Sequence, residues 1–331
     1  MGGDFGPEVT VPAALTALKK FTALKLILVG DRETITRQLQ KQGEAESDRL
    51  RIHHTTQVVT MDELPSRALR GKKDSSMRRA IDLVKLGEAA ACVSAGNTGA
   101  LMATARYVLK TLEGIDRPAI LTTLPTIRGH SHMLDLGANI DSSAEVLAQF
   151  AIMGSILSGV VDSIDRPTVG LLNVGEEEIK GNEQVKEAHK LLTAMEINYK
   201  GYIEGDDIYK GSVDVIVCDG FVGNVALKTS EGLAKMVSHY MREEFRRNLF
   251  TRLAAVVAMP VLRAFRRRID PREYNGASLV GLRGIVIKSH GGADSYSFAS
   301  AIGEAVIEVD KNVPQRIKDS VLSLMEGRKI A

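Results

Sequence analysis

Short apolar segments alternate with longer amphipathic segments along most of this 331-residue chain. The apolar segments are nearly continuous runs, which predicts strands that are covered by helices on both faces of a sheet. The intervening segments have the apolar spacing of helices, so the sequence predicts an α/β fold with a mostly parallel sheet flanked by helices. The predicted strands cover 24–30, 90–95, 133–137, 168–174, 213–218 and, more weakly, 284–288; the predicted helices cover 99–110, 143–159, 182–195 and 225–248.

No tandem repeat or long linker divides the chain, so we expect a single α/β domain over residues 1–331, with a projecting helical hairpin at 235–272. A chain of this length can bury a substantial core without disulfides, and the only two cysteines, Cys92 and Cys218, lie in apolar runs where inert thiols are expected. A net charge of only +2 argues against a nucleic-acid partner. No run of about 20 mainly apolar residues and no signal-like start is present, so we expect a cytoplasmic protein.

Glycine-rich segments follow four of the predicted strands, at 94–100, 135–139, 173–182 and 219–225. Ligands bind beyond the carboxyl ends of the strands in an open parallel sheet, so we expect these segments to meet at one edge. Segment 94–100 leads into a predicted helix, and its backbone N–H groups could hold an anion such as phosphate. The alternative is an ordinary strand-to-helix turn.

Two polar residues in these segments are candidates for catalysis. Lys180 follows three consecutive glutamates and precedes Gly181. A lysine at this edge of a sheet can offset the charge of a phosphate or a developing oxyanion, although a solvated lysine paired with acids is the alternative. Asn224 lies between Gly223 and Val225 at a predicted helix start, where asparagine can cap the helix or point at a substrate.

Several well-known catalytic motifs are absent from the sequence: there is no Walker-type phosphate loop, no GxGxxG after a strand and no GxSxG nucleophile elbow. The pair His130-x-His132 hints weakly at a metal site and is more typical of polar strand or loop residues. His130 and Asp135 also match an H-x4-D acyltransferase pattern, which we discount because Asp135 lies inside an apolar strand. We therefore expect no metal and no cofactor.

A strongly basic segment encloses an apolar one in the last third of the chain. Nine arginines and three acids lie between Arg242 and Arg272, around the uncharged residues 253–262. Pro260 interrupts a continuous helix, so we expect two helices that meet at an apolar tip. An apolar tip with flanking arginines is typical of a peripheral anchor on anionic lipid, and a dimer interface is the alternative. The predicted membrane contacts are Leu253, Val256, Val257 and Met259.

In their order along the chain, these segments resemble the PlsX family of phosphate acyltransferases. The matching segments span essentially the whole chain and include 1–7 (MGGDFGP), 94–102 (SAGNTGALM), 136–139, 171–175, 219–225, 274–277 and 287–291 (IKSHG). The resemblance implies an isopropylmalate-dehydrogenase-like α/β fold that is related to phosphotransacetylases. It also implies a homodimer that associates peripherally with the inner face of the cell membrane.

The resemblance implies an acyltransferase that moves a fatty acyl group from acyl-[acyl carrier protein] to inorganic phosphate, giving an acyl phosphate for phospholipid synthesis without a cofactor. Acyl carrier protein is the expected partner, with the downstream glycerol-3-phosphate acyltransferase as a further candidate. The family's catalytic lysine and asparagine fall on Lys180 and Asn224. The residues expected to bind phosphate or substrate are Asp4, Ser94, Gly96, Asn97, Thr98, Gly99, Asp135, Asn139 and Asp219.

Two other functional classes remain as alternatives. A NAD-dependent decarboxylating dehydrogenase shares the broad fold, but it needs metal-binding carboxylates and an adenine-binding segment that we do not identify in the sequence. A non-catalytic membrane scaffold explains the basic segment but not the glycine-rich segments. One departure from the family pattern concerns the start of the chain, because members usually carry a short strand ahead of the segment that begins at Met1. Either the start lies further upstream than Met1, or the protein lacks this strand. Without that strand we expect an unpaired sheet edge and a less supported loop at 2–4.

Overall fold

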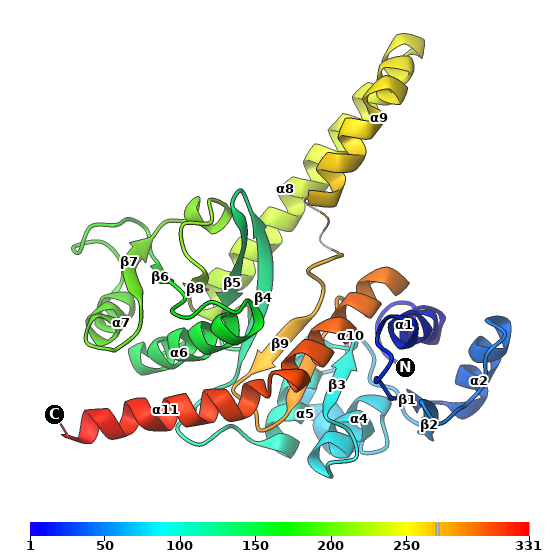
Figure 1. Cartoon of the computed structure of the whole chain (residues 1–331), viewed down its shortest axis with the longest axis horizontal. Helices are drawn as coiled ribbons and strands as arrows, with labels where there is room; N and C mark the ends of the chain where they lie inside the picture. The colour runs from blue at the N-terminus through cyan, green and yellow to red at the C-terminus, as the bar shows by residue number, and fades with distance from the viewer. Residues whose placement is uncertain (269, 271, 331) are drawn as a thin grey trace.

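The computed structural model describes residues 1–268, 270 and 272–330 (Figure 1). Its main sheet contains β3 (Ala91–Ser94), β4 (Ala119–Thr126), β5 (Gly129–Leu134), β6 (Val169–Leu172), β7 (Tyr199–Ile203), β8 (Val215–Val217), β9 (Ala277–Val280) and β10 (Ile285–Lys288). The eight strands lie in the order β3–β10–β9–β4–β5–β8–β6–β7. The predicted α/β fold with flanking helices is confirmed, and all six predicted strands are present.

The main sheet is mixed, although the sequence predicts a mostly parallel one. Strands β3 and β10 pair in parallel, as do β5, β8, β6 and β7 in their order across the sheet. Between these two blocks, β9 and β4 pair antiparallel with their neighbours. The reversals leave the two parallel blocks running in opposite directions. Half-polar strands such as β4, with its threonines and a proline, lack the continuous apolar run that identified the others.

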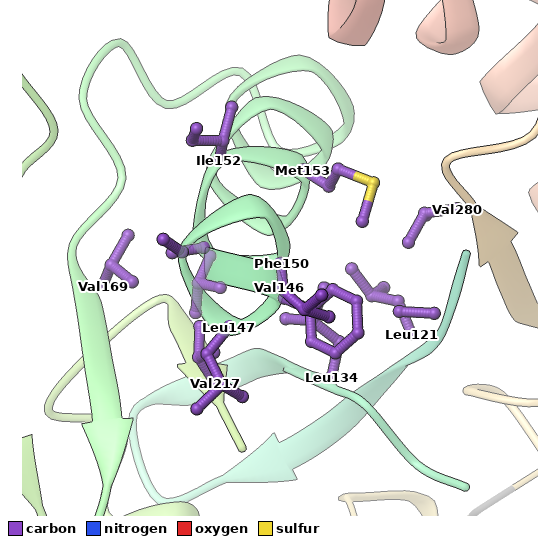
Figure 2. Close-up of a cluster of buried hydrophobic side chains, with 14 of the residues drawn as sticks. Leu121, Leu134, Val146, Leu147, Phe150, Ile152, Met153, Val169, Val217 and Val280 are labelled. Carbon is purple, nitrogen blue, oxygen red and sulfur yellow. The ribbon is translucent and has the colours of Figure 1, made fainter. Parts of the chain in front are cut away.

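Helices cover both faces of the sheet. The helices of the described residues are α1 (Pro7–Lys20), α2 (Arg32–Lys41), α3 (Pro65–Gly71), α4 (Ser76–Lys85), α5 (Thr98–Leu109), α6 (Ala144–Val161), α7 (Glu183–Thr193), α8 (Gly220–Arg246), α9 (Leu249–Arg268), α10 (Ser295–Asp310) and α11 (Val313–Ile330), with a short 3-10 helix at Asp207–Tyr209. The largest apolar cluster surrounds α6, which packs on β5 and β8 and against α7 and α11. Figure 2 shows Phe150 of α6 among strand residues that include Leu134 and Leu121.

A second sheet lies apart from the first and holds only β1 (Leu26–Gly30) and β2 (Leu50–His54), paired in parallel. The main sheet ends at β3, and a cavity of about 780 Å³ separates β3 from β1. Apolar side chains of both strands line the cavity, together with Met1, Met77 and Phe298. Among the described residues, β3 is the last strand on this side of the main sheet.

The helices α8 and α9 form an antiparallel hairpin that projects from the body of the molecule (Figure 1). The turn lies at residues 247–248, so the prediction that the chain turns near Pro260 is wrong, and Pro260 lies inside α9. Asn248 and Thr251 explain the position of the turn. The Oδ1 of Asn248 accepts a hydrogen bond from the N–H of Thr251 at 2.9 Å, and the Oγ1 of Thr251 accepts one from the N–H of Asn248 at 3.1 Å. This reciprocal capping starts a new helix at this point.

Candidate functional site

The glycine-rich segments gather in two groups. Segments 135–139, 173–182 and 219–225 follow β5, β6 and β8, which run in the same direction and end at one edge of the sheet. Segment 94–100 follows β3, which runs the opposite way. The register nevertheless places the ends of β5 and β3 at the same level of the sheet, because one row of paired residues runs from Leu134 through Leu121, Ser278 and Ile287 to Val93. The two groups therefore approach this level from opposite directions, and the meeting of segment 94–100 with the other three stays a prediction.

Segment 94–100 packs against residues 2–4 and 289–292. The N–H of Asp4 donates to the carbonyl of Gly291 at 2.9 Å, and a Cβ on Gly3 would lie 2.9 Å from that of Ala95. This close approach requires glycine at position 3, where φ is also +82°. The loops at the carboxyl ends of β3 and β10 thus form one assembly with the start of the chain, and Asp4 and Ser94 both belong to it.

Asn97 caps the helix that follows segment 94–100. Its Oδ1 accepts a hydrogen bond from the N–H of Ala100 at 2.9 Å, and its Nδ2 donates to the carbonyls of Met61 and Glu63 at 2.8 and 3.0 Å. The Oγ of Ser94 accepts from the N–H of Gly96 at 3.2 Å. These contacts agree with an ordinary strand-to-helix turn. The N–H groups of Thr98 and Gly99 lie in the first turn of α5, where helical N–H groups have no partner within the helix, and their contact with an anion stays a prediction.

Asp135 organises the loop at the end of β5 from a fully buried position. Its carboxylate accepts hydrogen bonds from the N–H groups of Ile120 and Ala138 at 2.9 and 3.1 Å, and from the N–H and Nδ2 of Asn139 at 2.7 and 2.9 Å. Burial raises the pKa of Asp135, while these hydrogen bonds oppose the rise. Asp135 and Asn139 therefore hold the loop in shape, and direct contact of either residue with substrate stays a prediction.

The helix α8 begins against this loop. Asp219 caps it, with Oδ1 accepting from the N–H of Val222 at 3.0 Å. A Cβ on Gly223 would overlap the carbonyl of Asp135, so glycine is needed for α8 to sit this close. Asn224 is not the helix cap, because it lies one turn inside α8. Its exposed amide faces Gly137, and none of the described residues is hydrogen-bonded to it.

Lys180 lies at the same sheet edge, in the loop that follows β6. Its Nζ is 2.7 Å from Oε2 of Glu177, and this pairing raises the pKa of Lys180. Asn173 fixes the loop, since its Nδ2 donates to the carbonyls of Gly175 and Lys180 at 3.0 and 3.2 Å. Lys180 is thus a partly exposed lysine paired with an acid. Its loop follows β6, and Asn224 follows β8, the strand that pairs with β6.

Lys288 is a candidate that the sequence reasoning did not single out. It ends β10, it is only 8% exposed, and its Nζ donates to the carbonyl of Ser289. Burial lowers the pKa of Lys288 to about 8; Asp4 opposes this shift and Lys228 of α8 adds to it. A lysine at the end of an apolar strand, ahead of Ser-His-Gly-Gly, is the signal that could have identified it.

The helix α8 connects the two groups of loops. It starts at the 135–139 loop, and its third to fifth turns carry Lys228, Glu231 and Lys235, whose charges act on His290 after the end of β10. Burial is the main reason why the pKa of His290 is lowered. The first turns of α8 therefore lie between the two groups.

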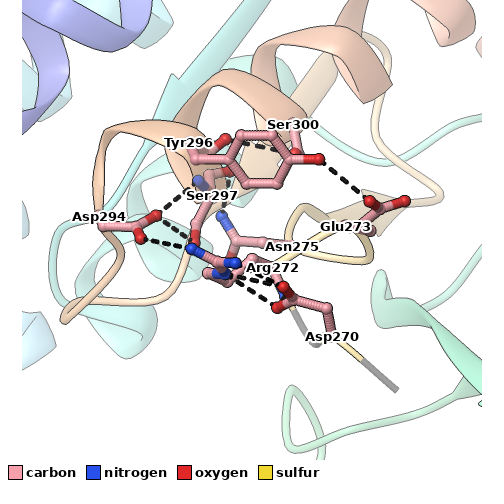
Figure 3. A network of polar contacts seen from close by, with 8 residues as sticks. All are labelled: Asp270, Arg272, Glu273, Asn275, Asp294, Tyr296, Ser297 and Ser300. Atoms are coloured by element: carbon pink, nitrogen blue, oxygen red, sulfur yellow. Dashed lines mark hydrogen bonds and ion pairs between the residues drawn. The ribbon is translucent and has the colours of Figure 1, made fainter. Parts of the chain in front are cut away.

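A polar network that includes Asp270, Arg272, Asn275 and Asp294 (Figure 3) supports the segment 289–292. The amide of Asn275 donates to the Oγ of Ser289 at 2.8 Å and accepts from the N–H of His290 at 3.0 Å. Arg272 pairs with Asp270 at 2.6 Å and with Asp294, the cap of α10, at 3.2 Å. The base of the hairpin is thereby tied to the loops that hold Lys288.

The sequence of this chain is similar to a known protein family. The chain matches the family model described as "Fatty acid synthesis protein" over residues 1–316. A protein of Alkalilimnicola ehrlichii named phosphate acyltransferase is 63% identical over 99% of this chain and 96% of its own length. One of Methylococcus capsulatus with the same name is 61% identical over 100% and 98% of the two chains.

Solved structures resemble this chain in fold. A phosphotransacetylase from Streptococcus pyogenes superposes with a TM-score of 0.64 at 18% identity, covering 92% of each chain. The EutD phosphotransacetylase from Staphylococcus aureus gives a TM-score of 0.60 at 16% identity, covering 93% of this chain and 92% of its own. The expected relation to the phosphotransacetylase fold is confirmed.

Proposed function

This chain belongs to the PlsX family of fatty acid synthesis proteins, and on that premise we propose that it transfers a fatty acyl group from acyl-[acyl carrier protein] to inorganic phosphate, releasing an acyl phosphate. The observation that carries the proposal is that this chain is 61–63% identical, over nearly its full length, to proteins named phosphate acyltransferase. The likeness of its fold to phosphotransacetylases agrees with acyl transfer and does not favour the dehydrogenase alternative.

The proposed reaction needs no protein nucleophile. A phosphate oxygen attacks the thioester carbonyl carbon, and the C=O electron pair moves onto oxygen to give a tetrahedral oxyanion. The carbonyl then re-forms, the C–S bond breaks, and its electron pair leaves with the thiolate of the carrier. Hydrogen phosphate is a dianion near neutral pH, because its relevant pKa lies at roughly 6 to 7. The two thiols agree with this route, since burial raises the pKa of Cys92 to about 12 and that of Cys218 well above its usual value.

The protein must then hold two substrates together and stabilise an oxyanion. We assign the oxyanion to Lys180 and Asn224, on neighbouring loops at one sheet edge. The Nζ of Lys180 leaves the carboxylate of Glu177 and pairs with the negative charge that develops on the oxyanion. The side-chain amide of Asn224, which has no partner among the described residues, donates to the acyl carbonyl oxygen. We assign phosphate to the start of α5, at Thr98 and Gly99, where helix N–H groups favour an anion.

Lys288 is the cation that we add to the phosphate site. It lies on the same loop assembly as segment 94–100, and burial has left it only weakly charged near pH 8. A bound dianion would favour its protonated form, so phosphate and Lys288 stabilise each other. Asp4, whose charge acts on Lys288, is the remaining polar residue of this proposed phosphate site.

The hairpin is the part that we propose to contact an anionic membrane at the inner face of the cell. All four residues predicted for this role are exposed on α9: Leu253, Val256, Val257 and Met259. Arginines of the same segment provide the positive charge that attracts anionic lipid. The homodimer, the docking of acidic acyl carrier protein on these arginines, and contact with the downstream acyltransferase are further parts of the proposal.

The decisive experiment measures acyl phosphate formed from acyl-[acyl carrier protein] and phosphate, without added nucleotide or metal. Lys180→Ala is expected to lower kcat about 10²- to 10³-fold, as the loss of one oxyanion donor does. Lys186→Ala is the matched control, because Lys186 also pairs with a glutamate three residues away and is expected to leave kcat unchanged. Near-normal kcat in folded Lys180→Ala would exclude its role, and absence of product from the unaltered protein would exclude the proposed function.

A further inference from the structure

Two histidines and an aspartate come together away from the candidate site. His130 and His132 lie two residues apart on β5, so both side chains project from one face of the sheet. Asp162, the residue that ends α6, reaches both of them. Its Oδ1 is 2.9 Å from Nε2 of His130, and its Oδ2 is 2.6 Å from Nε2 of His132. One ligand atom from each residue lies within 4.8 Å of the other two.

The surroundings of this trio orient its side chains. The Oγ1 of Thr123 lies 3.1 Å from Nδ1 of His132, and the Oγ of Ser158 donates to Oδ2 of Asp162 at 3.1 Å. Contacts of this kind, one layer behind the ligands, fix the ring orientation of histidines in metal sites. The carboxylates of Asp214 and Glu304 add negative charge around His130, which favours a cation there.

We propose that His130, His132 and Asp162 bind a divalent transition-metal ion, with zinc as the first candidate. Two imidazole nitrogens and one carboxylate oxygen form a ligand set that zinc and its neighbours in the periodic table prefer, whereas magnesium and calcium prefer oxygen ligands alone. Three protein ligands leave a fourth position, and the partly exposed ring of His130 opens it to water.

The trio needs only a small adjustment to accept the ion. Tetrahedral zinc, with bonds of about 2.0–2.2 Å, holds its ligand atoms about 3.4 Å apart. The ligand atoms of the trio already lie within 4.8 Å of one another, so the required shifts are on the order of 1 Å. His130 lies near the β4–β5 turn and is 39% exposed, so it can move this far. On binding, the Nε2 proton of His132 is replaced by one on Nδ1, which donates to Oγ1 of Thr123. The Nε2 proton of His130 passes to water, because that ring is partly exposed.

The position of the trio indicates a structural role. His130 and His132 lie toward the start of β5, whereas the 135–139 loop of the candidate site follows the end of that strand. The ion would fasten β5 to the end of α6 and would not touch the substrates of the proposed reaction. Metal-free, the same three residues form a hydrogen-bonded link between the same two elements.

Binding is tested on the full-length protein after treatment with chelator, using Zn²⁺ and Co²⁺ as probes. We expect one equivalent of Zn²⁺ to bind in a calorimetric titration and to raise Tm by about 5 °C at a hundredfold excess over Kd. Four-coordinate Co²⁺ is expected to give intense visible absorption bands. Both responses are expected to disappear in His130→Ala, and turnover is expected to remain unchanged.

Two further variants keep the test decisive. Asp162→Asn conserves the shape of the side chain and is expected to weaken Zn²⁺ binding at least tenfold. His239→Ala removes an exposed histidine on α8 and is expected to retain both responses in full. No saturable Zn²⁺ binding to the unaltered protein, or unchanged Zn²⁺ and Co²⁺ responses in His130→Ala, would overturn the proposal.

Discussion

The helix α6 and the hairpin helix α9 are both rich in apolar residues, yet they occupy opposite environments. An 18-residue window over α6 has a mean hydropathy of 1.7, long and apolar enough by composition to cross a membrane, but 61% of that window is buried inside the protein. The helix α9 carries exposed apolar residues along its length, together with arginines. Apolar composition alone therefore does not predict which of the two helices is buried and which is exposed.

The distribution of charge around each helix explains the difference. Only Glu145 is charged in α6, and apolar residues occupy most of its circumference, so most of its surface packs in the core. In α9 the arginines prevent burial in a protein core, because a buried charge without a partner is costly. The exposed apolar side chains of α9 thus remain available for a partner outside the chain.

The largest effect is expected from two phenylalanines, one on each helix. Phe150→Ala empties a fully buried site of α6 and is expected to lower the free energy of unfolding by about 3–5 kcal/mol. Phe250→Ala on α9, where the side chain is 84% exposed, is expected to change it by less than about 0.5 kcal/mol. Urea unfolding followed by circular dichroism measures both. Similar losses for the two variants would show that the hairpin packs on the body in solution.

A smaller effect concerns buried and exposed carboxylates. Burial raises the pKa of Glu308 on α10 to about 8, whereas in the unfolded chain it is near 4.5, so the folded state loses stability as pH rises between these values. The loss amounts to about 3 kcal/mol between pH 5 and pH 8. Glu308→Gln is expected to remove this dependence, and Glu244→Gln on the exposed hairpin is expected to keep it. A flat stability profile for the unaltered protein would refute the assignment.

The next effect concerns lipid binding, which we expect for the exposed apolar residues of α9 and not for those of the body. Val257→Asp places a charge at a position that is 76% exposed on α9 and is expected to weaken binding to anionic vesicles about tenfold or more. Ile127→Asp is the control, because Ile127 is 85% exposed on the body, in the β4–β5 turn. Co-sedimentation with vesicles measures both. Equal binding by both variants would leave the dimer interface as the role of α9.

The smallest effect concerns the turn of the hairpin. Asn248→Ala removes the cap of α9 and is expected to cost about 1 kcal/mol, confined to the start of that helix. Hydrogen exchange near Thr251 is expected to accelerate while the Tm of the body stays constant. A lower Tm for the whole protein would mean that the hairpin and the body unfold together.

The sequence predicted the buried strands and the helices between them, because continuous apolar runs and helical spacing are local signals. It did not predict β4 or β9. Each of them pairs with its neighbour along the chain, β5 or β10, but their pairing with each other joins distant segments, and so the sequence missed the reversal of direction between the two parallel blocks. The sequence also predicted a turn near Pro260. The turn lies at residues 247–248 instead, because Asn248 caps the start of α9.

The candidate site shows the same limit. Lys180 and Asn224 follow strands that could be recognised locally, so their shared edge was predictable. The burial of Asp135, the pairing of Lys180 with Glu177 and the role of Lys288 depend on how distant segments meet. Asp162 lies 30 residues beyond His132, and only the fold brings the two together.

The gap between β1 and β3 divides the protein into two parts that are joined without a continuous backbone ladder. The sheet of β1 and β2 has its own small apolar cluster with α2, and it meets the body through the side chains of α1 and α4. This part can detach without breaking a ladder hydrogen bond of the eight-stranded sheet. We expect it to open at a lower free energy than the rest, as a separate cooperative unit, so that proteases cut first within residues 31–54.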